Sequence, residues 1–132
     1  MKLDGVRELD GKIRELERRL ESLKSSIFPT PELDGQPRAK MHYSRIEKIT
    51  VSIVDLEREL AELRAEQFSE RIDLIAALFK RVRHADAFTV LEMRYVRCQD
   101  FKTIAKTMHF SEGRVYELHR RGVRDFDAVD KN

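Results

Sequence analysis

The clearest hydrophobic pattern in the sequence lies near its N-terminus. From residue 6 to residue 27, apolar residues alternate at steps of three and four, and most positions between them are charged or polar. This spacing predicts an amphipathic helix over residues 1–27, with mostly β-branched residues at the a positions of a heptad and leucines at d. The seam suits a two-stranded homodimer, but its three heptads suit packing against a helix of the same chain equally well. The predicted dimer seam comprises Val6, Leu9, Ile13, Leu16, Leu20 and Leu23.

A linker and a long helix are predicted next. All three prolines fall in residues 28–40, where they deny a helix its backbone donors, and a long amphipathic pattern follows over residues 41–83. A step of five between Leu63 and Phe68 divides this pattern into two apolar series and turns the apolar face around the helix axis. We expect the first series to pack on the N-terminal helix and the second to pack into a C-terminal module. The second series comprises Phe68, Ile72, Ile75, Phe79 and Val82, with Leu74 and Leu78 widening its face.

The C-terminal module is predicted over residues 84–127, with a short tail at 128–132. Its first helix is marked by Phe88, Leu91 and Tyr95, which recur at helical spacing and define one apolar face. A second helix is predicted to follow, because an N-cap residue precedes a further run of helical periodicity. This second helix has Asp100 as its cap, Phe101, Ile104, Ala105 and Met108 on its apolar side, and Lys102 and Lys106 on the other side.

The final helix has the most informative distribution of side chains. Ser111 is placed to cap it, after a short turn formed by His109 and Phe110. We expect Ala105 to permit a close crossing of the last two helices, and Gly122 to do the same from the other side. When successive side chains are placed about 100° apart around the helix axis, one side of the final helix is apolar and the opposite side is mainly basic. The first side holds Val115, Leu118, His119, Gly122, Val123 and Phe126, and the second holds Gly113, Arg114, Glu117, Arg120, Arg121 and Arg124.

These patterns predict an all-α protein in which an N-terminal helical hairpin or coiled coil precedes a helix-turn-helix module. Such a module inserts the first turns of its second helix into the major groove of double-stranded DNA, while the preceding helix crosses the phosphate backbone. The residues at base-reading positions are Glu112, Gly113, Arg114 and Glu117. The residues placed to contact phosphates are Lys102, Lys106, Arg120, Arg121 and Arg124.

The charge balance supports this prediction moderately. The formal net charge of the chain is +2, which does not by itself indicate nucleic acid. From Arg94 to Arg124, eight basic residues stand against three acidic ones, a net charge of +5, but from His84 to the C-terminus nine stand against eight, a net of +1. The sequence therefore contains a basic stripe within a module that is nearly neutral.

Three stretches carry a resemblance to known families: VLEMRYV, then FKTIAKTMHFS, then GRVYELHRRGVRDF. Over about residues 88–126 they resemble the promoter-reading helix-turn-helix of bacterial sigma factors, and they are similar to phage late transcription regulators of the RinA and ArpU type. The resemblance implies a DNA-binding transcription regulator that also acts with RNA polymerase. It places Ser111 at the helix cap and Arg114 and Glu117 at reading positions, whereas Glu112-Gly113 departs from the sigma pattern.

Other classes of protein find little support in the sequence. We expect no enzyme, no metal and no cofactor, because no nucleophile–base set or cluster of metal ligands is recognisable. The single cysteine, Cys98, excludes an internal disulfide and fits a reducing compartment, and no apolar run suits a membrane span. The expected location is therefore the cytoplasm.

Two alternatives to transcription regulation remain open. Small terminase subunits of phages also combine coiled coils with DNA-binding helices, so a role in DNA packaging fits the same pattern. A ring of eight or more subunits would favour packaging, and a dimer would favour regulation. The other alternative is a helical adaptor that binds an acidic protein partner through its basic face and does not bind DNA.

Overall fold

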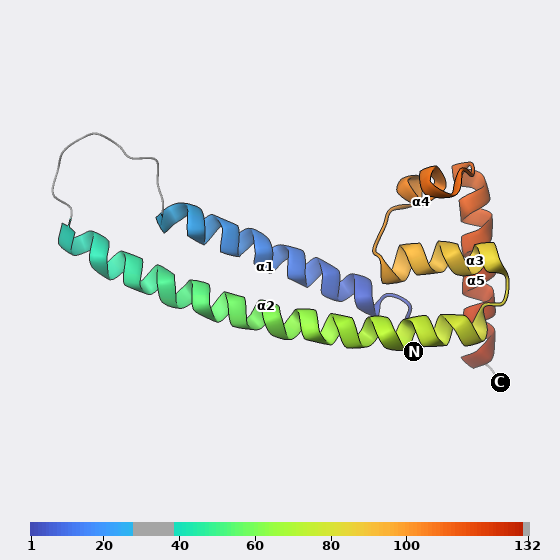
Figure 1. Ribbon diagram of the computed structural model, residues 1–132, viewed down its shortest axis with the longest axis horizontal. Coiled ribbons are helices and arrows are strands. Elements are labelled where there is room, and N and C mark those ends of the chain that lie inside the picture. The colour runs from blue at the N-terminus through green and yellow to red at the C-terminus, as the bar shows by residue number, and fades with distance from the viewer. Residues whose placement is uncertain (28–38, 131–132) are drawn as a thin grey trace. The chain divides into compact units, whose positions relative to one another are not determined.

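The structure is a computed structural model, which describes residues 1–27 and 39–130 (Figure 1). Within these residues every regular element is a helix, which confirms the predicted all-α class. The predicted linker lies outside the described residues except for its last two positions, which begin a helix. The elements are α1 (Gly5–Ile27), α2 (Ala39–Arg81), α3 (Ala85–Leu91), the π-helical turn η1 (Glu92–Val96), α4 (Phe101–Met108) and α5 (Glu112–Asp130).

The chain forms two compact units, and each contains an apolar core. Unit 1 comprises Met1–Asp10 and Gln67–Asn132, and unit 2 comprises Gly11–Glu66. The division falls inside α1 and α2, so both long helices contribute residues to both units. The DNA-binding prediction concerns residues of unit 1.

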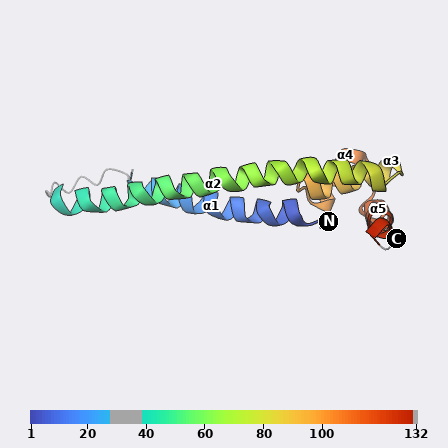
Figure 2. The same ribbon diagram turned by 90° about the horizontal axis from the view of Figure 1, so that it is seen from below.

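In unit 2, the α1 and α2 segments lie side by side in both views (Figures 1 and 2). Ile13, Leu16 and Leu60 are buried together, and Leu20, Leu56 and Leu63 pack against them. Exposed ion pairs join the same two segments: Arg64 Nη2 lies 3.1 Å from Glu17 Oε1, and Lys24 Nζ lies 3.4 Å from Glu57 Oε1. Ile13, Leu16 and Leu20 of the predicted dimer seam therefore pack against α2 of the same chain. Packing within the chain was the alternative to dimerisation that the heptad pattern allowed.

In unit 1, the start of α1 contributes to a core together with α2, α3, η1 and α5. Val6, the first residue of the predicted dimer seam, is buried in this core. The buried side chain of Gln67 donates a hydrogen bond from Nε2 to the carbonyl oxygen of Val6 at 3.2 Å, which fixes the α1 segment at this point. The buried members of the cluster are Val6, Leu74, Leu78, Val82, Ala87, Leu91, Tyr95, Val96 and Phe126.

The face of α2 that we expected to enter this core was predicted correctly only in part. Leu74, Leu78 and Val82 are buried, but the other four members of the predicted series are 41–78% exposed. The helix is apolar on two faces in this region, and the core of unit 1 covers the face that carries the two leucines. The exposed residues are Phe68, Ile72, Ile75 and Phe79.

The helix that starts at Ala85 widens into η1, a feature that helical periodicity did not predict. The backbone N–H of Arg97 donates to the carbonyl oxygen of Glu92 at 3.1 Å, an i→i+5 bond typical of a π-helical turn. The next residue, Cys98, has a left-handed backbone with φ 59°. Arg94 closes the segment, because its Nη1 donates to the carbonyl oxygen of Gln99 at 3.2 Å.

A second apolar cluster joins α3, η1, α4 and α5. Its buried members are Val90, Met93, Ile104, Ala105, Val115 and Leu118. Ala105 and Val115 come from the two helices that we expected to cross closely. Gly122 has a different neighbour from the one expected: a Cβ at this position would lie 2.8 Å from Leu91 Cδ1 and 3.4 Å from the carbonyl oxygen of Ala87. The small residue therefore permits a close approach of α5 to α3, which it crosses in Figure 1.

Candidate nucleic-acid interface

Side-chain caps define where α4 and α5 begin. Asp100 Oδ1 accepts a hydrogen bond from the backbone N–H of Thr103 at 2.7 Å, and Ser111 Oγ accepts one from the backbone N–H of Arg114 at 3.1 Å. The hydrogen bonds from Thr103 hold the pKa of Asp100 below its ordinary value. Between the two helices, His109 adopts a left-handed backbone conformation that ends α4. The connection is therefore three residues long and capped at both ends.

All four predicted base-reading residues are exposed at the start of α5. The structure brings two of them together: Arg114 Nη1 lies 3.2 Å from Glu117 Oε2, with side chains 48% and 59% exposed. At Gly113, an added Cβ would meet Ser111 Oγ at 4.0 Å, an ordinary contact distance, so packing within the chain does not require a glycine there. The first two turns of α5 consequently present a guanidinium, two carboxylates and uncovered backbone to solvent.

The predicted phosphate contacts are also exposed. Lys102 and Lys106 lie on the side of α4 away from its buried residues, and three arginines extend along the exposed side of α5. Within residues 1–27 and 39–130, none of these five side chains forms an ion pair or a hydrogen bond. Their charged groups are available to an external anion. The arginines are Arg120, Arg121 and Arg124.

Side chains from η1, α4 and α5 form a cluster around the aromatic ring of Phe101. The ring of Phe101 lies 4.7 Å from Tyr116 and 5.1 Å from His119, measured between ring centroids. The guanidinium of Arg94 stacks over Phe101, with Cζ 4.3 Å from the ring centroid. These contacts fix the orientation of α5 relative to α4, and with it the direction in which the arginines of α5 point.

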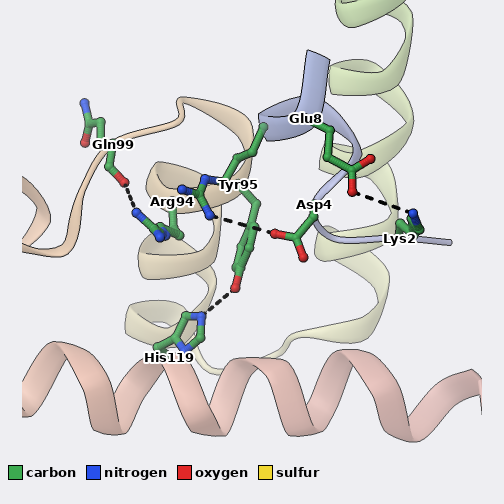
Figure 3. Close-up of polar contacts among 8 residues, drawn as sticks. Lys2, Asp4, Glu8, Arg94, Tyr95, Gln99 and His119 are labelled. Atoms are coloured by element: carbon green, nitrogen blue, oxygen red, sulfur yellow. Dashed lines mark hydrogen bonds and ion pairs between the residues drawn. The ribbon is translucent and has the colours of Figure 1, made fainter. Parts of the chain in front are cut away.

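Tyr95 and His119 complete this cluster with a hydrogen bond between the Tyr95 hydroxyl and His119 Nε2, which are 2.7 Å apart (Figure 3). Burial lowers the pKa of His119 below 6.5, with a further contribution from Arg94, so the imidazole is neutral at pH 7. Burial also raises the pKa of Tyr95, which keeps its hydroxyl protonated. The sequence placed both residues on apolar faces, but helical spacing alone could not show that they meet, since they lie 24 positions apart.

The described residues contain no group of three or more histidine, cysteine, aspartate or glutamate side chains arranged to hold a metal ion. Nor does any helix in the described ranges combine the length and the apolar character needed to span a bilayer. In comparisons with known proteins, no family model, curated protein or solved structure matches the chain.

Proposed function

We propose that this protein is a sequence-specific DNA-binding transcription regulator of the phage late-gene type implied by its sequence resemblance. In this proposal, α4 and α5 form a helix-turn-helix, and α1 with α2 forms the helical hairpin expected from the heptads. The observation that carries the proposal is the two-sided character of α5. Val115, Leu118 and Phe126 are buried on one side, and the arginines on the other side are exposed.

The start of α5 suits the major groove of DNA. An α-helix with its side chains is about 10–12 Å across, and the major groove is about 12 Å wide. Arg114 supplies the forked donor that pairs with guanine, and Glu117 supplies an acceptor for the amino group of cytosine. Because no side chain extends from Gly113, the backbone can approach the base edges closely.

Phosphate contacts are supplied from both helices. Lys102 and Lys106 on α4, together with the three arginines of α5, provide five cations without an ion pair in the described structure. If each neutralises one phosphate, the logarithm of the association constant should fall with the logarithm of salt concentration with a slope of roughly −4.5. RNA polymerase is the further partner that the resemblance implies.

The proposal is tested with the full chain in two steps. Selection from a library of random duplexes should enrich one sequence, which is then compared with a scrambled duplex by fluorescence anisotropy over a series of salt concentrations. Arg114→Ala should weaken binding to the selected site by roughly 5- to 150-fold, equivalent to about 1–3 kcal/mol, while binding to the scrambled duplex changes little.

Lys106→Ala is the matched variant, because it removes a cation that is expected to contact phosphate. It should weaken binding to both duplexes by a similar factor and reduce the salt slope by about 1. Equal binding by the wild type and both variants at low salt would contradict the proposal. In that case the adaptor alternative would gain support.

A further inference from the structure

Unit 1 exposes a continuous apolar stripe along α2. The stripe consists of Phe68, Ile72, Ile75 and Phe79, which follow one another at steps of four, three and four residues. These steps place the four side chains within about 60° of arc, roughly a third of a turn from the buried leucines of the same helix. Scattered single apolar residues are normal on a protein surface, but a contiguous stripe with two phenylalanines is typical of an interaction surface.

The residue types in the stripe and the spacing between them are the same from either end. The order phenylalanine, isoleucine, isoleucine, phenylalanine is symmetric about the midpoint between residues 73 and 74, and so are the three steps that separate the residues. An interface between two identical copies related by a two-fold axis requires that residue i contacts residue j while j contacts i. This stripe meets that requirement when two copies of the helix run antiparallel.

We infer that this stripe is the contact surface between two copies of the chain, packed antiparallel about a two-fold axis near residues 73 and 74. Phe68 of each copy then packs against Phe79 of the other, and Ile72 packs against Ile75 of the other. Both pairs match large apolar groups at the a and d positions of a short heptad seam.

Small residues beside the stripe allow the two helices to approach closely. Ser69 and Ala76 are exposed next to it on the same flank, and the same alignment places Ser69 of one copy about 3 Å along the helix axes from Ala76 of the other. Phe79 also contacts a residue of its own chain. Its ring packs edge to face against Phe88 of α3, with the ring centroids 6.4 Å apart. This contact restricts the ring before association and so reduces the entropy that dimerisation would cost.

The exposed area predicts a weak dimer. From the areas typical of these side chains, the four residues expose on the order of 450 Å² in each copy, or about 900 Å² for the pair. Specific interfaces generally bury more than about 1,000 Å², and weak or transient ones lie near this limit. We therefore expect association in the micromolar range, driven by apolar contact, and this inference does not depend on DNA binding.

Analytical ultracentrifugation of the full chain between about 1 µM and 1 mM tests the inference. The wild-type mass should rise with concentration from 15.6 kDa toward twice that value. Ile72→Glu should raise the dissociation constant at least ~100-fold, because each interface contains the charge twice. Phe68→Ser is a second variant that should have the same direction of effect without introducing a charge.

Val51→Glu is the matched control, since Val51 is 56% exposed on the same helix but outside the stripe. It should leave the dissociation constant within about threefold of the wild type, and circular dichroism should show that all variants remain helical. A wild-type chain that stays monomeric at 1 mM would overturn the inference. An equal loss of association in Val51→Glu and Ile72→Glu would overturn it as well.

Cysteine cross-linking tests the orientation. In a Cys98→Ser background, chains with Ser69→Cys are mixed with chains with Ala76→Cys under mild oxidation. The antiparallel arrangement predicts that the mixed dimer cross-links faster than either chain with itself. Positions 69 and 76 of the two copies would be about 3 Å apart along the helix axes, whereas two copies of position 69 would be about 13 Å apart and two copies of position 76 about 8 Å apart. Rapid self-cross-linking of the Ser69→Cys chain would contradict the antiparallel arrangement.

Discussion

Arg114 and Glu117 form an ion pair on the exposed side of α5, with Nη1 of the arginine 3.2 Å from Oε2 of the glutamate. Both side chains are about half exposed, and pairs of this kind on a helix surface contribute about 0.2–0.5 kcal/mol to stability. The pair is therefore too weak to keep the guanidinium from DNA. It positions Arg114 one turn from Glu117 and places a negative charge where a duplex would approach.

This arrangement predicts that Glu117→Ala strengthens non-specific DNA binding. Removing the carboxylate frees Arg114 and eliminates repulsion of phosphates, so affinity for a scrambled duplex should rise roughly 3- to 10-fold near 50 mM salt and by less at higher salt. Preference for the selected site should fall at the base pair that Glu117 is proposed to contact. Fluorescence anisotropy with both duplexes measures the two effects, and Glu117→Gln is the control that retains the shape of the side chain. Weaker binding of Glu117→Ala to every duplex would contradict this role.

The second prediction concerns the core between α4 and α5. Leu118 is 1% exposed and packs in the cluster that includes Ile104 and Val115. Leu118→Ala should lower the free energy of unfolding by about 2–5 kcal/mol, through lost burial and the cavity left behind. Urea denaturation followed by circular dichroism measures this change. Arg121→Ala, on the exposed side of the same helix, should stay within about 0.5 kcal/mol of the wild type, and an equally small effect of Leu118→Ala would show that the core does not depend on this contact.

Helical periodicity predicted the buried sides of α4 and α5 because each of these helices has one apolar side. Ile104 and Leu118 were assigned to the interior, and both are buried. The same reasoning failed for α2 between Phe68 and Phe79, where two different sides of the helix are apolar. Periodicity identifies an apolar face, but it does not show whether the same chain or another molecule covers it.

The sequence pattern could not predict contacts between residues that are far apart in the chain. The hydrogen bond between Tyr95 and His119 depends on η1, where the backbone departs from the 3.6-residue period that the prediction assumed. Burial of Ile13 and Leu16 against Leu60 was one of two outcomes that the heptads allowed equally. In both cases the deciding information is the three-dimensional packing, which a local pattern does not contain.

The third prediction compares two glycines in helices. At Gly122, an added Cβ would lie 2.8 Å from Leu91 Cδ1, and at Gly11 it would meet nothing within 4 Å. Gly122→Ala should therefore lower the free energy of unfolding by about 1–3 kcal/mol, because α5 must move away from α3. Gly11→Ala should raise it by about 0.5–1 kcal/mol, because alanine favours a helix. Thermal and urea unfolding of both variants check this, and a stabilising effect of Gly122→Ala would show that the close approach is not required.

The fourth prediction concerns the pH dependence introduced by His119. Burial holds the pKa of this imidazole in the folded protein below its ordinary value of 6.5, so between these two values the unfolded chain binds the proton more readily. The stability that depends on neutral His119 is therefore present above about pH 6.5 and is lost as the pH falls toward the folded pKa. Between pH 8 and pH 5, the wild type should lose stability relative to His119→Gln, as measured by urea unfolding at each pH.

Tyr95→Phe tests whether this pH dependence arises from burial of the His119 imidazole or from its hydrogen bond to Tyr95. The variant removes the 2.7 Å hydrogen bond but keeps an aromatic ring beside His119, so burial of the imidazole is retained. Because burial is the largest cause of the lowered pKa, the pH dependence should persist in Tyr95→Phe, and an NMR titration of His119 should still give a pKa below 6.5. A constant difference in stability between the wild type and His119→Gln from pH 8 to pH 5 would instead mean that the folded protein accommodates the protonated imidazole as readily as the unfolded chain does.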